Sequence, residues 1–195
     1  FPTRRSSDLA RRRAEQEARD AEQARREAAV RAEAAARAFG VPCLEQPGYE
    51  ADDIIAHLCW EDHPQIIIVS CDHDLYQLLS PRVSIWNMPK SQMVTDESFR
   101  KEWNIEPSQW ADVKAIAGCS TDNIQGVKGV GEKTAVKFLT GGLKQGAKFI
   151  SIVEGTHLWE RNLKLVRLPY PGLNPARLQV TKDRVSQVKW VEVCK

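Results

Sequence analysis

The sequence lacks a long apolar run. No stretch approaches the roughly 18 consecutive apolar residues that identify a membrane-spanning helix. No charged, apolar and small-residue signal peptide opens the chain either. These two absences argue against membrane insertion and against secretion. We therefore expect a cytoplasmic protein with no membrane partner.

The sequence also lacks a recognisable cysteine framework. Its 5 cysteines are odd in number and show no C-x-x-C spacing, so the pattern indicates neither a set of disulfides nor a zinc site. We expect the other cysteines to be small buried hydrophobes and single out Cys119 for its position in the chain. The others are Cys43, Cys59, Cys71 and Cys194.

A strong excess of one charge is missing as well. The 28 basic and 26 acidic residues leave a formal net charge of +2, which is too small to indicate nucleic-acid binding by itself. With 195 residues and 42% hydrophobic content, the chain can bury one sizeable core, with or without an appended helix. We expect a single globular domain.

The N-terminal 39 residues divide into a leader and a helix. Residues 1–9 show no periodicity, and we interpret them as a non-native or disordered leader. Residues 10–39 are rich in Ala, Arg, Glu and Gln and contain neither Gly nor Pro, which predicts one long helix. A solvated helix with i,i+4 charge pairs accounts for this composition. Alanines repeat along one side of the helix, and such small side chains offer only weak packing.

Short strands and helices alternate over residues 40–106. Strands are expected at residues 41–44, 66–70, 83–87 and 93–94, and helices at residues 50–60 and after a Thr95 cap. The apolar run at 66–70 predicts a central parallel strand covered on both faces. The alternation predicts an α/β fold with a mostly parallel sheet. Residues 107–195 form a predicted helical subdomain, opened by Pro107 and ending in a basic tail.

A glycine-rich segment separates two predicted helices at residues 111–118 and 134–139. Gly129 and Gly131 permit a tight turn that leaves amide N–H groups pointing outward, and a helix starting near Glu132 adds the positive end of its dipole. A lone Gly-x-Gly is more typical of an ordinary turn between helices. The flanking lysines and apolar positions instead favour a helix-hairpin-helix that grips a nucleic-acid backbone without reading bases. The predicted contact residues are Lys128, Gly129, Val130, Gly131, Lys133, Thr134 and Lys137.

Carboxylates mark three places in the chain. Glu50, Asp52 and Asp53 begin one predicted helix, Asp72 and Asp74 follow the strand at 66–70, and Asp122 precedes the hairpin. Taken singly, these residues suit helix starts and turns. Because the strand ends of an α/β sheet line one crevice, Asp72 and Asp74 are expected at its floor. Such an all-oxygen set suits two Mg²⁺ or Mn²⁺ ions, which can activate water for phosphodiester hydrolysis. The predicted catalytic residues are Asp52, Asp72, Asp74 and Asp122.

Three blocks in one order resemble the 5′-nuclease family, which includes flap endonucleases, their phage relatives and the 5′-nuclease domain of bacterial DNA polymerase I. The blocks are GVPCLEQPGYEADDIIAHL, IIIVSCDHDLYQLLS and residues 117–139. The resemblance implies a PIN-like fold with a helix-three-turn-helix segment. It implies that Glu50, Asp52, Asp72, Asp74 and Asp122 are metal-binding acids, and that Asp53 matches an extra acid of the bacterial branch. It also implies a potassium ion at the hairpin.

The same resemblance implies an activity and partners. We expect a metal-dependent 5′-3′ exonuclease or flap endonuclease acting in DNA replication or repair, encoded by a bacterium or a phage. Its substrate would be DNA with a flap, a 5′ end or a branch, or an RNA–DNA hybrid. We expect a monomer that works with a fused or separate DNA polymerase. The helix at 10–39 would stand where family members carry the arch above the active site, with its arginines touching phosphates.

Two departures from the family pattern define the alternative. Cys119 occupies a position where many bacterial members have an acid, which predicts a weaker second metal site. Nothing before Glu50 matches the family's early aspartate-bearing strand, which predicts a fragment lacking part of the active site. The alternative function is a non-catalytic nucleic-acid-binding module that keeps the hairpin.

Overall fold

The computed structural model describes residues 4–61, 63–120, 122–170 and 179–181. The chain divides into two compact units, which we treat separately. One consists of residues 1–45 with 178–195, and the other of residues 46–177. In the part of the chain that the structure describes, no helix is long and apolar enough to cross a membrane.

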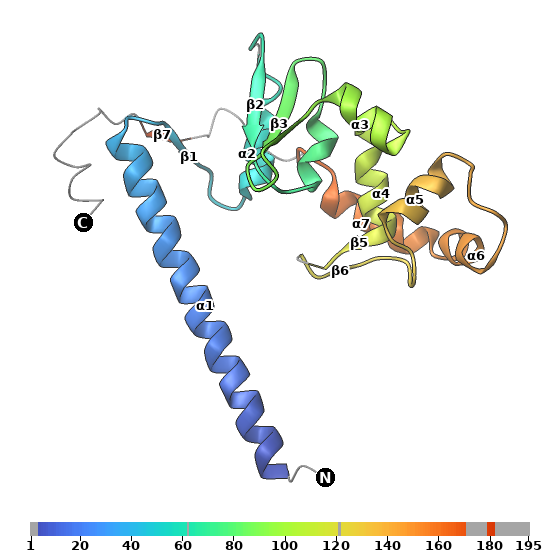
Figure 1. The fold of residues 1–195 in the computed structure, drawn as a ribbon, viewed down its shortest axis with the longest axis horizontal. Coiled ribbons are helices and arrows are strands. Elements are labelled where there is room, and N and C mark those ends of the chain that lie inside the picture. Colours follow the sequence, from blue (N-terminus) through green and yellow to red (C-terminus); the bar gives the residue numbers. More distant parts are fainter. Residues whose placement is uncertain (1–3, 62, 121, 171–178, 182–195) are drawn as a thin grey trace. The chain divides into compact units, whose positions relative to one another are not determined.

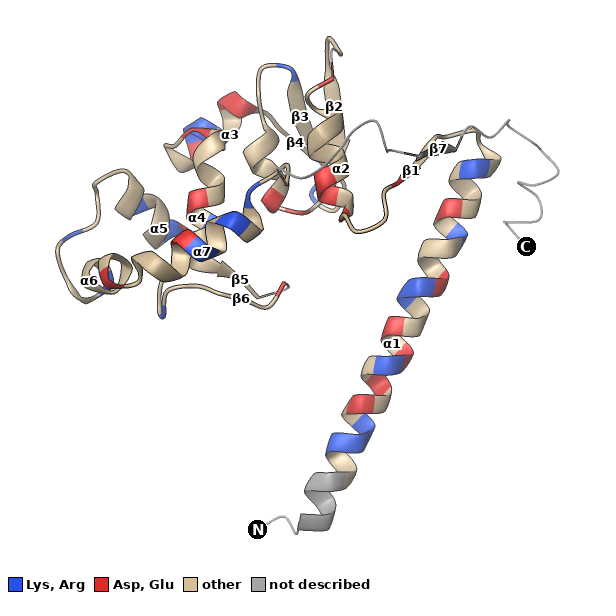
Figure 2. Ribbon diagram, turned by 180° about the vertical axis from the view of Figure 1, so that it is seen from behind, with Lys and Arg blue, Asp and Glu red and all other residues tan. Residues whose placement is uncertain are grey.

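The first unit contains one long helix and a two-stranded ribbon. Helix α1 (Arg4–Ala38) begins before residue 10, so part of the predicted leader is helical. Its strong helix formers extend the helix without a capping stop. Side chains from Leu9 to Arg31 are exposed, and opposite charges alternate along the helix (Figure 2). Arg11 and Glu15, four residues apart, form an ion pair at 2.8 Å. Strand β1 (Cys43–Glu45) pairs antiparallel with β7 (Gln179–Thr181).

The second unit contains a small mixed sheet of order β2-β3-β4 (Figure 1). Its strands are β2 (Ile66–Val69), β3 (Val83–Asn87) and β4 (Gln92–Val94). The first two are parallel and the last two antiparallel. The prediction of a mostly parallel sheet is therefore met by one strand pair only, because β4 returns from β3 through a short turn.

Strand β2 departs from the expected central position. Ile68 is buried, whereas Ile67 and Val69 are 52% and 61% exposed on the other face. Among the described residues, β2 pairs only with β3, so it is an edge strand. The prediction of a strand covered on both faces is wrong for the described part of the chain, since its apolar run packs on one side only.

Short helices surround the buried face of the sheet. Helix α2 (Ala51–Leu58) starts after Glu50, and the 3₁₀ helix η1 (Asp74–Leu78) follows β2. Helix α3 (Asp96–Trp103) has the predicted Thr95 cap, which accepts a hydrogen bond from the Ser98 amide at 3.1 Å. The 3₁₀ helix η2 (Pro107–Gln109) leads into α4 (Trp110–Ala117). Phe99 and Trp110 are buried, with ring centroids 5.4 Å apart.

The helical part is built around α4, which contacts α5 (Glu132–Leu139) and α7 (Thr156–Val166). Between α4 and α5 the chain forms a small ribbon of β5 (Gly118–Cys119) and β6 (Ile124–Gln125), and α6 (Ala147–Glu154) precedes α7. The fully buried Asn162 side chain donates hydrogen bonds to the carbonyls of Ala115 at 3.0 Å and Gln125 at 2.8 Å. This amide ties α7 to α4 and to the ribbon.

Candidate metal centre and nucleic-acid hairpin

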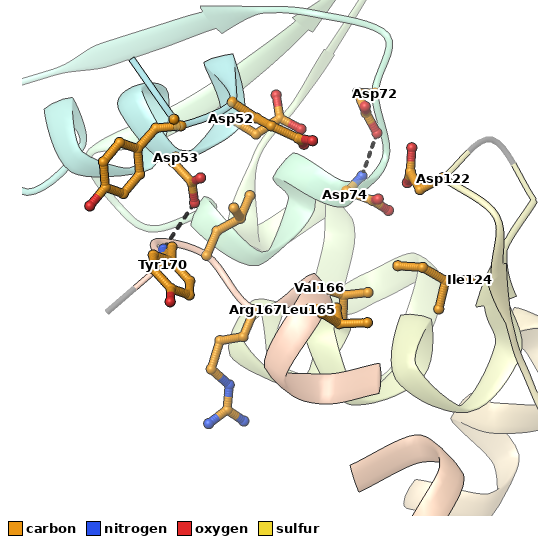
Figure 3. Close-up of a pocket in the computed structure, with 14 residues that line it drawn as sticks. Asp52, Asp53, Asp72, Asp74, Asp122, Ile124, Leu165, Val166, Arg167 and Tyr170 are labelled. Atoms are coloured by element: carbon orange, nitrogen blue, oxygen red, sulfur yellow. Dashed lines mark hydrogen bonds between the residues drawn. The ribbon is translucent and has the colours of Figure 1, made fainter. Parts of the chain in front are cut away.

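Carboxylates from three separate segments line one cavity of about 520 Å³. They come from the start of α2, the turn between β2 and η1, and the segment between β5 and β6 (Figure 3). The structure therefore brings together all six acids singled out in the sequence. These are Glu50, Asp52, Asp53, Asp72, Asp74 and Asp122.

The turn after β2 sets the positions of two of these acids. The amide of Asp74 donates a hydrogen bond to Asp72 Oδ1 at 2.8 Å, and the amide of Asp72 donates to Ser70 Oγ at 3.0 Å. The side chains of Ser70 and Asp72 thus accept local hydrogen bonds that are typical of turn residues. The turn brings both aspartates to the end of β2, and Figure 3 shows Asp122 facing them.

Lys114 is a member of the site that the sequence analysis missed. Its ammonium lies 2.9 Å from Asp74 Oδ1 and 3.5 Å from Glu132 Oε1, and the side chain is only 10% exposed. Burial lowers the pKa of Lys114. Asp74 raises it, with smaller upward contributions from Cys119 and Glu132, and together these acids outweigh burial, so the net pKa shift is upward. The lysine therefore stays charged and balances part of the negative charge. Its only sequence signal was a lysine on the otherwise apolar helix WADVKAIA.

Like charges raise the proton affinity of the site. Burial, followed by the charges of Asp72 and other nearby acids, raises the pKa of Asp52 to about 6. Burial also raises the pKa of Asp74, although the Lys114 ammonium opposes that shift. A bound divalent cation would stabilise the ionised form of these carboxylates, because its charge offsets the repulsion between them. Without the cation, protonation relieves that repulsion.

Without divalent metal, the protein is expected to become more stable as the pH falls from about 7 to about 5. The folded state takes up a proton at Asp52 near pH 6, whereas the unfolded chain does so only near 3.8, so stability decreases as the pH rises through this window. Because Asp52 is partly solvated, we expect an effect of about 1 kcal/mol. Melting temperatures in a chelator, compared with those of Asp52→Asn, measure it. A melting temperature that rises equally with pH in both proteins would contradict this expectation.

Asp53 and the C-terminal side of the cavity form a second set of contacts. Asp53 Oδ1 accepts a hydrogen bond from the Tyr170 amide at 3.0 Å, so this carboxylate faces the loop after α7 (Figure 3). The Gln77 side chain holds the same loop, donating to the Val166 carbonyl at 2.9 Å and accepting from the Leu168 amide at 2.8 Å. Sequence reasoning had assigned no role to Leu165, Val166, Arg167, Leu168 and Tyr170, which line this side.

The glycines of the hairpin differ from each other. Gly129 has a φ of +74°, a left-handed conformation that favours glycine. Gly131 is extended, with φ −110° and ψ 176°, and its carbonyl accepts from the amides of Thr134 and Ala135 at the start of α5. The sequence analysis treated these two glycines alike, but of the two only Gly129 adopts a backbone conformation that favours glycine.

The side chains of the hairpin separate into a core and a surface. Val130 is only 6% exposed and packs in the core, so its side chain is not available to a ligand. Lys128, Lys133 and Lys137 are exposed, and α5 begins at Glu132 as predicted. The first amides of a helix lack intrahelical partners, so exposed lysines beside this helix start provide the elements of a phosphate-binding site.

An α/β unit with an acidic cavity, joined to a hairpin with exposed lysines, defines a nuclease-like architecture. A family model described as the 5′-3′ exonuclease N-terminal resolvase-like domain matches residues 10–104. A second, described as the 5′-3′ exonuclease C-terminal SAM fold, matches residues 105–148. The chain belongs to the 5′-3′ exonuclease family.

The chain spans only part of the curated relatives that it matches. It is 42% identical over 104 residues to the thermostable DNA polymerase I of Thermus thermophilus, which is 52% of this chain and 12% of the polymerase. It is 46% identical over 107 residues to a 5′-3′ exonuclease of Halalkalibacterium halodurans, which is 52% of this chain and 35% of that protein.

Solved structures of bacteriophage T5 proteins share the fold. A 5′-exonuclease with bound divalent zinc ions superposes with a TM-score of 0.56 at 27% identity, covering 63% of this chain and 51% of that chain. A flap endonuclease in a complex with DNA and metal ions gives a TM-score of 0.56 at 26% identity, covering 63% and 51%. Both similarities extend over more than half of this chain, which exceeds a shared small motif.

Proposed function

We propose that this chain carries the metal-binding and DNA-binding parts of a 5′-3′ exonuclease or flap endonuclease. The observation that carries the proposal is the convergence of six acids, distant in sequence, on one cavity. Family membership and the functions of the relatives support the same reaction class. The hydrolysis of a phosphodiester bond in DNA is the reaction that such a site suits best.

The cavity residues fit divalent cations. The six carboxylates provide oxygen ligands, and Lys114 is the cation paired with them among the described residues. We assign catalytic positions to Asp52, Asp72, Asp74 and Asp122, with Glu50 and Asp53 completing the metal-binding set. Oxygen ligands favour Mg²⁺ or Mn²⁺. Two such ions, when bound, would supply an activated water and stabilise the charge on the phosphate. The protein's part is to hold these ions in place through residues on α2, η1 and the β5–β6 segment.

The hairpin is proposed to hold the DNA backbone. Lys128, Lys133 and Lys137 would contact phosphates, the amides near Gly129 and Gly131 would donate to them, and Thr134 lies in the first turn of α5. A potassium ion among the hairpin carbonyls belongs to the same proposal. We further propose a monomer acting on flaps, 5′ ends, branched DNA or RNA–DNA hybrids, with a DNA polymerase as fused or separate partner.

A nuclease assay on 5′-labelled flap DNA, with Mg²⁺ or Mn²⁺ titrated from zero, tests the function. We expect cleavage that requires metal and that stops with chelator. Tight DNA binding without cleavage at any metal concentration would contradict the proposal and support a non-catalytic binding module. The assay is run on the 195-residue chain, with and without chelator.

Lys133→Ala is expected to weaken binding to all DNA sequences alike and to reduce the salt slope of log K by about one unit, because one phosphate contact is lost. Fluorescence anisotropy over a salt series, on two unrelated duplexes, measures both quantities. Lys101→Ala, which removes an exposed lysine from α3, is the matched control and should leave the slope unchanged. If Lys133→Ala changes the preference between the duplexes instead, the hairpin reads bases.

Gly131→Val tests whether the backbone amides of this hairpin contact phosphate. A Cβ at Gly131 meets no atom within 4 Å, and the extended backbone accepts any residue. We therefore expect unchanged stability but weaker DNA binding, since the added methyl groups occupy the space before the first amides of α5. Unchanged DNA affinity would show that the phosphate lies elsewhere on the hairpin.

A further inference from the structure

One sulfur atom lies among the cavity's carboxylates. The potential ligand atoms of Asp74, Cys119 and Asp122 all lie within 4.8 Å of one another. These residues come from η1, from β5 and from the segment before β6. Atoms this close can share one ion, so the group offers two carboxylate oxygens and one sulfur to a single metal.

The backbone holds Cys119 firmly in this position. Cys119 pairs with Ile124 across the β5–β6 ribbon and is only 7% exposed. The amide of Val127 donates a hydrogen bond to the Ile116 carbonyl at 2.8 Å, which ties the far end of the ribbon to α4. The sulfur therefore belongs to a strand that follows directly from α4 and pairs with β6.

The charge around Asp74 points to a cation in the same place. Asp74 Oδ1 is buried, and its nearest cation among the described residues is the Lys114 ammonium, at 2.9 Å. Lys114 supplies one positive charge to a cavity lined by six carboxylates, so negative charge remains there for a metal ion to balance.

We propose that Cys119 is a metal ligand and that, with Asp74 and Asp122, it forms a mixed thiolate–carboxylate site that prefers a thiophilic ion such as Zn²⁺ or Co²⁺ to Mg²⁺. The inference rests on the proposed metal-dependent function and specifies the ion for one part of the cavity. Binding replaces the thiol proton with the metal ion, and that proton is released to solvent. Thiolate suits zinc and its neighbours, whereas Mg²⁺ takes hard oxygen ligands. The other cavity carboxylates, Glu50, Asp52, Asp53 and Asp72, remain suited to Mg²⁺.

Cobalt absorption tests the ligand directly. Titrating Co²⁺ into the reduced 195-residue chain should produce a sulfur-to-cobalt charge-transfer band in the near ultraviolet. Cys119→Ser should remove the band and weaken Co²⁺ binding by about 10- to 100-fold or more. Cys71→Ser is the matched control and should keep the band. Cys71, next to Asp72, is exposed, so the expectation from the sequence that it is buried is wrong. A band that is absent from the unaltered chain, or that survives in Cys119→Ser, overturns the proposal.

Two further measurements do not depend on how Cys119→Ser folds. X-ray absorption of the Zn²⁺-loaded, unaltered chain should show one sulfur at about 2.3 Å in a shell otherwise of light atoms. Cys119→Asp should shift the competition between Zn²⁺ and Mg²⁺ toward Mg²⁺ by tenfold or more, an effect of about 1.4 kcal/mol. A zinc coordination shell without sulfur would overturn the inference. Mg²⁺-dependent cleavage in that case would leave the proposed function standing, so the two failures are distinguishable.

Discussion

Asp74→Asn is expected to lower metal-dependent DNA cleavage by more than about 100-fold while leaving DNA affinity unchanged. Asparagine keeps the shape of the side chain but removes the charge and one good oxygen ligand. Asp74 lies where the carboxylates from α2, from the turn after β2 and from the β5–β6 segment meet, and it lies within 4.8 Å of the ligand atoms of Cys119 and Asp122. The hairpin that would bind phosphate is formed by other residues, so binding should survive.

Single-turnover cleavage and binding in a non-cleaving buffer with Ca²⁺ would separate the two effects. Asp96→Asn is the matched control, because the Asp96 side chain, on α3, is 15% exposed like that of Asp74 and does not line the cavity. It should leave cleavage unchanged. If Asp74→Asn reduces cleavage and binding by the same factor, Asp74 acts through the fold and not through a metal.

Asp74→Asn should also change the electrostatics of Lys114. The ammonium would lose its nearest anion and keep only Glu132, at 3.5 Å. Because Asp74 is the main contributor that raises the pKa of Lys114, that pKa should fall in the variant. This interaction could not be predicted from the sequence, since a lysine on a helix surface is usually solvated and Lys114 lies 40 residues from Asp74.

The acids were easier to predict than the sheet around them. Turn and helix-start positions place carboxylates at strand ends, and the order of the three blocks is visible in the sequence alone. The run IIIV of β2 indicates burial but not the number of faces that are buried. Ile67 and Val69 are exposed because no described element lies over them, and such an arrangement depends on distant parts of the chain.

The role of the hairpin glycines was partly misassigned for a similar reason. A Gly-x-Gly pattern shows where a tight turn can form, and Gly129 does have a positive φ. The pattern cannot show which glycines face another backbone across a ribbon. Gly118 and Gly126, which drew little notice in the sequence, are the glycines on which the site's geometry depends.

Gly126→Ala is expected to destabilise the second unit by about 3 kcal/mol or more. A Cβ at Gly126 would overlap the carbonyl group of Ala117 and the amide nitrogen of Gly118. Both are backbone atoms, so no change of side-chain rotamer can make room. At Gly118, which has a φ of +79°, a Cβ would lie 2.6 Å from the Ile124 carbonyl oxygen, which shows that the ribbon is closed tightly from both strands.

The consequences of Gly126→Ala should extend from stability to metal binding. To accept the methyl group, the β5–β6 ribbon must separate from the end of α4, and the hydrogen bond from the Val127 amide to Ile116 would be weakened. Cys119 and Asp122 would then move away from Asp74. Gly126→Ala should therefore lose stability in chemical denaturation and affinity in metal titration together. In Asp74→Asn the two losses should not occur together. Gly131→Ala is the control, because its Cβ meets no atom within 4 Å. If Gly126→Ala folds as stably as that control and binds metal normally, the ribbon does not hold the site in the way that its backbone contacts indicate.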